Sequence, residues 1–210
     1  MRRTLICLLA LCFPAVALAA EPTLKEARTR WLAGNYDEAR TAYEALSKAA
    51  KAPPAAFIGL SRCHESVGDH DKALEAVAEG LKSSPNDADL LARQAELLYS
   101  RGRWDEADKA ADKALQAKAE HFLARWIKAQ LYRDRAQIEK ADEAFRWFVR
   151  TYTERSNADK DIKDPEELAI VGKAGVENAN AHALTDQFAF ILNDMYSDAL
   201  KEDPNAWYIE

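Results

Sequence analysis

Apolar residues recur three or four positions apart along this chain, in short segments that end at glycine or proline. This spacing is typical of amphipathic helices, and it predicts one helix pair over each of residues 24–51, 55–84 and 88–118. The sequence has only 7 glycines, while alanine, leucine, glutamate and lysine abound. This composition favours an all-helical protein.

The turns inside the three helix pairs repeat at a fixed interval. Gly34, Gly68 and Gly102 lie 34 residues apart, and each is followed by an aspartate three positions later and an alanine five positions later. The glycine is expected to end one helix, the aspartate to cap the next, and the alanine to allow two helices to approach closely. A period of 34 residues is that of a helix-turn-helix solenoid.

These in-phase turns resemble those of tetratricopeptide repeats, over nearly the whole chain after its first 20 residues. Pro85 stands where that family has the proline that closes a unit, whereas Phe57, Leu60 and Ser61 replace the family's tryptophan, leucine and glycine in the first helix of the second unit. The resemblance implies a right-handed α-solenoid of antiparallel helix pairs, with about five units.

The N-terminal stretch, residues 1–19, has the features of a signal peptide. Arg2 and Arg3 precede an apolar run, and Ala17-Leu18-Ala19 matches a cleavage site. The run is too short for a membrane anchor, and Leu11 before Cys12 disfavours a lipoprotein. We therefore expect export to the periplasm or beyond, with cleavage near Ala19 and no membrane insertion afterwards.

The remaining chain divides at a polar segment. Residues 20–155 are expected to form units one to four, with 136–141 replacing the glycine turn in unit four, and 156–164 to form a charged insertion loop. Asp164 is expected to cap a helix from 165 to about 182, which pairs with a helix over 186–201 in a fifth, longer unit within 165–210. Trp207 and Tyr208 then resemble the truncated start of a sixth unit, an uncapped end through which copies could self-associate.

Charge and chemistry narrow the possible functions. Without Arg2 and Arg3, 27 basic residues face 35 acidic ones, a formal charge of −8, which disfavours nucleic acid as a partner. Cys63 is the single cysteine left after cleavage, and it is expected to be a buried filler rather than a reactive thiol. A metal site at His64 and His70 and a calcium loop at 159–167 are both disfavoured against structural roles. No catalytic motif or cofactor fingerprint is present, so we expect a non-enzymatic protein without cofactor or metal.

The resemblance also implies where a partner would bind, because the first helix of each unit lines the concave groove in this family. The residues at these positions that could hold a protein or peptide partner are Arg28, Trp31, Ile58, Arg62, Glu65, Glu96, Tyr99, Trp126, Gln130 and Arg133. Aromatic and arginine side chains are common anchors of interfaces, although Trp31 and Trp126 could equally be core. The lysine, asparagine and arginine pattern with which some members clamp a chain terminus is not met.

The expected function is therefore an exported scaffold or adaptor that binds a protein segment in its groove. The alternative is the substrate-recruiting N-terminal repeat segment of a larger secreted enzyme, such as a peptidase, truncated here.

Overall fold

A computed structural model describes residues 22–158, 160–181 and 201 of the chain. The helices of these residues run in the order α1 (Leu24–Leu32), α2 (Tyr36–Ser47), α3 (Pro54–Ser66), α4 (His70–Ser83), α5 (Ala88–Ser100), α6 (Trp104–Ala117), α7 (Phe122–Asp134), α8 (Ile138–Asn157) and α9 (Pro165–Ala181). No strand occurs in this described part. The predicted all-helical class is confirmed.

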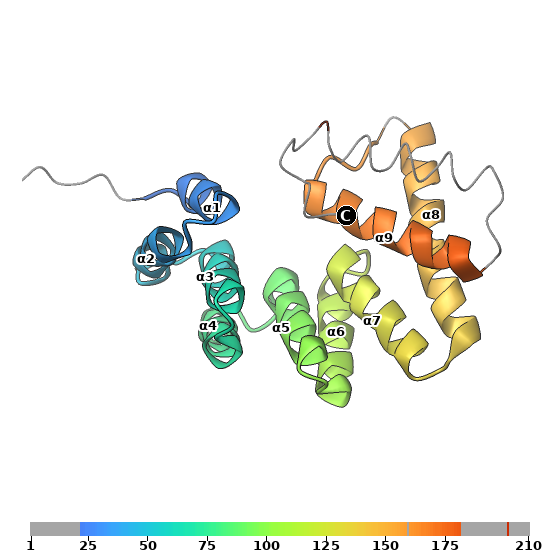
Figure 1. The fold of residues 1–210 in the computed structure, drawn as a ribbon, viewed down its shortest axis with the longest axis horizontal. Coiled ribbons are helices and arrows are strands. Elements are labelled where there is room, and N and C mark those ends of the chain that lie inside the picture. Colours follow the sequence, from blue (N-terminus) through green and yellow to red (C-terminus); the bar gives the residue numbers. More distant parts are fainter. Residues whose placement is uncertain (1–21, 159, 182–200, 202–210) are drawn as a thin grey trace, which may run out of the picture.

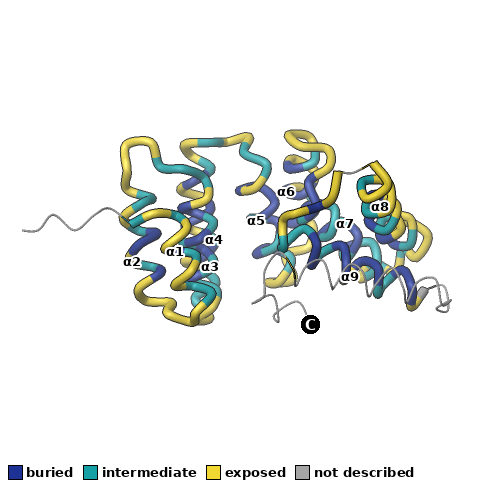
Figure 2. The backbone as a smooth tube through the Cα atoms, turned by 90° about the horizontal axis from the view of Figure 1, so that it is seen from above, coloured by how far each residue is buried: buried dark blue, intermediate teal, exposed yellow. Residues whose placement is uncertain are grey.

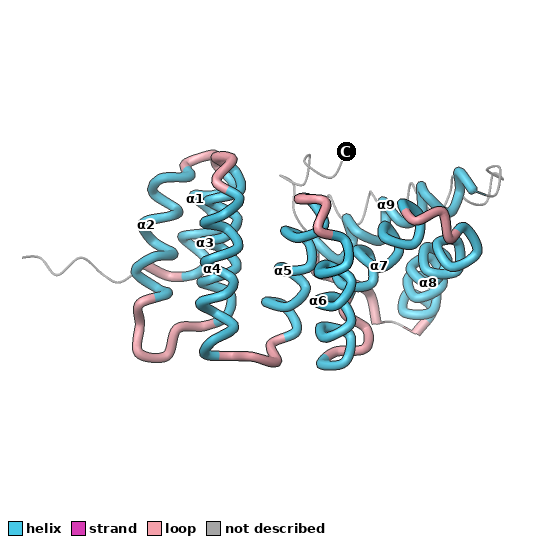
Figure 3. Tube along the Cα trace, turned by 90° about the horizontal axis from the view of Figure 1, so that it is seen from below, coloured by secondary structure: helices cyan, strands magenta, loops and turns pink. Residues whose placement is uncertain are grey.

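Successive helices pair and the pairs stack in a row (Figure 1). Short turns join α1 to α2, α3 to α4, α5 to α6 and α7 to α8, and Figure 3 shows these pairs side by side along the solenoid. The first helices of the pairs also contact one another, α1 with α3, α3 with α5, and α5 with α7. They form a continuous inner layer, which is the layer that the sequence assigned to the groove.

Each of the first three turns depends on a glycine in the left-handed region. Gly34, Gly68 and Gly102 have φ values of 79°, 80° and 71°, where an L residue with a side chain is strained. The residue after each glycine donates its amide hydrogen to a carbonyl of the preceding helix, as Asn35 does to Arg30 at 2.9 Å. In the fourth unit Ala136 adopts the same turn with φ 56° and no glycine.

The prediction that the shared aspartate caps the second helix of each unit is wrong. Asp37, Asp71 and Asp105 lie inside the first turn of α2, α4 and α6, because each helix begins two residues after the glycine. The N-cap positions belong instead to Asn35, Asp69 and Arg103, and of these only the Asp69 side chain accepts a capping hydrogen bond. The shared carboxylates still stabilise the helices by facing the positive end of the helix dipole.

The repeated alanine occupies the position predicted for it. Ala39, Ala73 and Ala107 are completely buried where the helices cross, and Ala141 takes the same place in the fourth unit. Buried residues occur in each helix pair of the stack, where they form four apolar clusters in the described chain (Figure 2). Small side chains permit close approach of the helix backbones, and the burial of this apolar surface stabilises the stack.

The segment after the fourth pair returns over the inner layer. α8 extends to Asn157, and Asp164 then caps α9 by accepting hydrogen bonds from the amides of Glu166 and Glu167 at 2.8 and 3.0 Å. This capping role is as predicted. The connecting loop is not wholly solvated, however, since Ile162 is buried in the same apolar cluster as Phe148 and Leu168. α9 packs against α7 and α8.

Several sequence predictions lie outside the described residues. These are the signal peptide at 1–19, most of the second helix of the fifth unit, and the start of a sixth unit at Trp207 and Tyr208. Within the described part, no helix has the length and apolar character that crossing a membrane requires.

Candidate functional site

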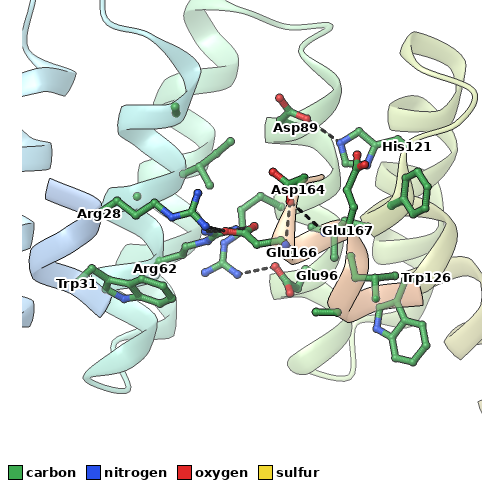
Figure 4. A pocket seen from close by; sticks show the side chains of 18 of the residues that line it. Arg28, Trp31, Arg62, Asp89, Glu96, His121, Trp126, Asp164, Glu166 and Glu167 are labelled. Atoms are coloured by element: carbon green, nitrogen blue, oxygen red, sulfur yellow. Dashed lines mark hydrogen bonds and ion pairs between the residues drawn. The ribbon is translucent and has the colours of Figure 1, made fainter. Parts of the chain in front are cut away.

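The inner layer of helices and α9 line an open cavity of about 780 Å³. Its wall is made by side chains of α1, α3, α5 and α7 on one side, and by residues 164–173 on the other (Figure 4). Ligand pockets in proteins are commonly of this size. Four successive repeat units therefore contribute to one binding space.

The structure places seven of the ten predicted groove residues on this wall. They are Arg28, Trp31, Ile58, Arg62, Glu65, Glu96 and Trp126. All seven are partly exposed, so they have surface to offer a partner.

The other three predicted residues, Tyr99, Gln130 and Arg133, do not line the cavity. The Tyr99 hydroxyl donates to Asp134, and burial together with this carboxylate raises the pKa of Tyr99 to about 12. Arg133 pairs with Glu177 of α9 at 2.5 Å. These two residues connect neighbouring helices, while the buried Oε1 of Gln130 has no hydrogen-bond partner within the described chain.

The two groove tryptophans combine packing with exposure to the cavity. Trp31 packs on the α1–α2 core, donates its indole N–H to the Ser66 hydroxyl at 3.0 Å, and has the Arg62 guanidinium 5.7 Å from its ring centre. Trp126 packs on the cores at both of its sides, with its ring 5.8 Å from that of Phe145. Each tryptophan therefore packs against the core with part of its ring and lines the cavity with another part.

Arg93, a residue of α5, has hydrogen-bond partners on α3 and on its own helix. Its guanidinium donates to the Ser61 hydroxyl at 2.9 Å, to Glu65 at 2.7 Å and to Glu96 at 2.6 Å. The Arg93 side chain is only 4% exposed. A charge buried to this extent requires such partners, so we assign Arg93 to the wall's internal structure.

Arg28 and Arg62 are paired differently, with a carboxylate that comes from α9. Arg62 donates from its two terminal nitrogens, Nη1 and Nη2, to the two carboxylate oxygens of Glu166 at 2.6 and 2.5 Å. Arg28 Nη2 donates a third hydrogen bond to the same carboxylate at 3.1 Å. The three side chains converge in the middle of the cavity (Figure 4). Burial alone would raise the pKa of Glu166, but the hydrogen bonds and positive charges of the arginines outweigh it and hold the pKa below its ordinary value. Glu166 is therefore ionised at neutral pH.

A second polar pair lies at the opposite end of the cavity. His121 caps α7 through Nδ1, which accepts from the Ala124 amide, and its Nε2 lies 2.9 Å from Asp89. This hydrogen bond lowers the pKa of Asp89, while burial and the charge of Asp164 raise the pKa of Glu167 beside it. Because both nitrogens of His121 are engaged, its role here is structural.

Nothing in the described residues groups histidine, cysteine and carboxylate side chains as a metal site would require. Cys63 is buried, and burial raises the pKa of its thiol to about 11, which keeps it protonated and unreactive. His64 belongs to α3, and burial lowers its pKa. The cavity wall combines arginine and carboxylate hydrogen bonds with an apolar and aromatic surface.

Sequence reasoning missed the residues that α9 brings into the site. The sequence places Glu166 and Glu167 at the start of a helix, and it carries no signal that singles out Arg93 or Asp89. The 34-residue period assigns only the inner helices to the groove, and no periodic signal predicts that a later helix will return there. The excess of carboxylates at 164–167, beside an inner layer rich in arginine, was the available hint.

Comparisons with known proteins agree with this fold. Residues 24–88 match the family model described as tetratricopeptide repeat. A tetratricopeptide repeat protein from Parabacteroides merdae has a similar structure, with a TM-score of 0.55, 19% identity, and coverage of 89% of this chain and 74% of that one. The structure of MamA protein gives a TM-score of 0.50 and 15% identity, over 86% of this chain and 90% of that one.

One curated relative matches in sequence. It is the transcription factor tau subunit sfc4 of Schizosaccharomyces pombe, 28% identical over 126 residues, which is 56% of this chain and 12% of the relative. The chain thus spans a small part of that protein's length. Residues 24–88 are thus similar to the tetratricopeptide repeat, and the stacked helix pairs have the fold of an all-helical repeat solenoid.

Proposed function

We propose that this chain is a non-enzymatic scaffold or adaptor that binds a peptide or protein segment in its inner groove. The observation that supports it most is the cavity of about 780 Å³ to which four successive units contribute. Its wall carries aromatic and arginine side chains, which anchor protein partners well because they bury much surface at low entropic cost. The described residues offer binding groups there and no activated nucleophile.

Site-specific photo-crosslinking tests this proposal. A diazirine amino acid at Ile58 faces the cavity, and the same amino acid at Lys113, on the exposed outer surface of α6, is the matched control. In the native cell we expect discrete cross-linked protein products from position 58 and not from position 113. Equal products from both positions, or none from position 58, would contradict groove binding.

Export is the second part of the proposal. It rests on the basic start, the apolar run and the Ala17-Leu18-Ala19 site. N-terminal sequencing of the protein from fractionated native cells is expected to begin near Ala20 and to find the protein outside the cytoplasm. A cytoplasmic protein that retains Arg2 and Arg3 would refute export and leave groove binding untouched.

A further inference from the structure

The carboxylate of Glu166, a residue of the same chain, occupies the space between Arg28 and Arg62 and is hydrogen-bonded to both. It lies 104 residues after Arg62 and 138 residues after Arg28 in sequence. Among the described residues it is the carboxylate to which both arginines are hydrogen-bonded, whereas Arg93 is saturated by Ser61, Glu65 and Glu96. Without Glu166, the groove would present two uncompensated guanidinium groups.

The charges on the two sides of the cavity are complementary. The wall that residues 24–126 form carries five cationic and three acidic side chains, namely Lys25, Arg28, Arg62, Arg93 and Lys118 against Glu65, Asp89 and Glu96. The side that α9 and its cap form carries three acidic and one cationic side chain, namely Asp164, Glu166, Glu167 and Lys173. The repeat stack is thus a positive surface, and α9 supplies the matching negative charge.

α9 does not depend on this ion pair for its position. Leu168, Val171 and Ala174 are buried in the apolar cluster shared with α7 and α8. Glu166 lies in the first turn of the helix, one residue after Pro165, and its side chain points away from that cluster toward Arg28 and Arg62. The carboxylate can therefore leave the arginines while the helix stays docked.

The ion pair is also partly solvated. The side chains of Arg28, Arg62 and Glu166 are 39%, 22% and 32% exposed. Ion pairs that keep contact with water contribute little net free energy, because hydration compensates each charge when the pair opens. A competing carboxylate from a partner could thus take the place of Glu166 at small cost, and the adjoining cavity has room for the partner's neighbouring side chains.

We infer that Arg28 and Arg62 form a carboxylate-binding subsite, occupied at rest by Glu166, and that the partner segment presents an aspartate or glutamate side chain that displaces it. This inference rests on the proposed function, since it assumes that a protein segment enters this groove. The subsite selects acidic segments, because a guanidinium pair binds a carboxylate bidentately and is left unpaired by a neutral side chain. Glu166 lowers the affinity for every such segment and so sets a threshold for binding.

A peptide-binding experiment with the full chain tests the subsite. The probe is a fluorescein-labelled peptide with blocked ends that copies residues 160–172, and a second peptide has glutamine in place of the residue that corresponds to Glu166. Fluorescence anisotropy is measured with the wild-type chain and with the Glu166→Gln chain. We expect the acidic peptide to bind the variant about threefold more tightly than the wild type, which corresponds to about 0.65 kcal/mol and is in the range of a partly solvated ion pair. The glutamine peptide is expected to lose this gain.

Two further variants make the result specific. Adding Arg62→Gln to Glu166→Gln is expected to abolish the gain in affinity. The matched control is Glu177→Gln, which breaks another arginine pair on the same helix, that of Arg133, and is expected to leave peptide affinity as in the wild type. Circular dichroism checks that all the chains are equally helical.

Equal affinity of the two peptides for the Glu166→Gln chain, a gain that survives Arg62→Gln, or no binding of the acidic peptide would overturn the subsite. Cross-linking from position 58 can still succeed in each of these cases. Groove binding would then stand with a different recognition chemistry, so the two failures are distinguishable.

Discussion

The three helix pairs of α1 to α6 and the segment from α7 to α9 start from the same repeat but follow it to different degrees. In the first part the glycine turns recur every 34 residues, and alanines are the commonest buried residues in two of its three apolar clusters. In the second part Ala136 replaces the turn glycine, aromatic rings dominate the core, and α9 sends Glu166 back to α1 and α3. The regular part thus forms most of the groove wall, and the irregular part supplies the carboxylate that pairs with Arg28 and Arg62.

The cores of the two parts should respond differently to loss of volume. Phe148 is fully buried among the rings of Phe122 and Trp147, so Phe148→Ala is expected to lower the free energy of unfolding by about 4 kcal/mol. Val77→Ala in the regular part removes less volume and is expected to cost about 2 kcal/mol. Urea denaturation followed by circular dichroism measures both. Equal losses would show that the aromatic cluster is no more critical than the aliphatic core around Val77.

Removal of Arg93 and removal of Arg62 should lower the free energy of unfolding by different amounts. Arg93→Ala removes a buried charge and leaves Glu65 and Glu96 without their partner, and since these carboxylates keep some contact with water we expect a loss of about 2 kcal/mol. Arg62→Ala, at the partly exposed pair with Glu166, is expected to cost less than half of that. The same denaturation measurement decides. A larger loss at Arg62 would mean that the pair with Glu166 is a structural element rather than a displaceable contact.

Two substitutions in the turns should change stability in opposite directions. Gly102→Ala puts a side chain at φ 71° and is expected to lower the free energy of unfolding by about 1 kcal/mol. Ala136→Gly relieves the same strain at φ 56° and is expected to raise it by a smaller amount, because the added freedom of the unfolded chain opposes the gain. Thermal denaturation would refute this explanation if both substitutions had the same sign.

The smallest expected effect is the pH dependence of the stability that Glu166 contributes. The pKa of Glu166 is lower in the folded chain than in the unfolded one, so its contribution to stability is fully present above its ordinary pKa of 4.5 and is lost as the pH falls through the lower, folded value. The stability difference between the wild type and Glu166→Gln should therefore shrink below pH 4.5 and be constant near neutrality. Glu177→Gln again serves as control. A difference that grows in acid would reverse the sign of the proposed interaction.

The sequence predicted the regular part of the fold well, because period and turn chemistry act locally. The glycines at 34, 68 and 102 and the buried alanines five positions later depend only on contacts within a unit or with the next one. The cap assigned to Asp37 and its equivalents was wrong because a shift of two residues at the helix start is invisible in the pattern.

The candidate site was only partly predictable for the same reason. Residues of the inner layer, such as Arg62 and Trp31, follow from their positions in the repeat. Glu166 does not, because its place depends on the path of a connection that breaks the period, and on the apolar contacts of Ile162 and Leu168 that fix that path. Tyr99 and Arg133 were predicted to line the groove but do not. Their positions in the repeat do not reveal that Asp134 and Glu177 pair with these side chains.

The central claim is that the groove binds a protein segment and that Glu166 competes for part of it. The most direct test is the yield of cross-linked partner from position 58 in chains that carry either Glu166→Gln or Glu177→Gln, expressed in the native cell. More product is expected with Glu166→Gln than with the wild type, and an unchanged yield with Glu177→Gln. An equal yield in all three chains would contradict the competition, and the absence of any product from position 58 would contradict the groove itself.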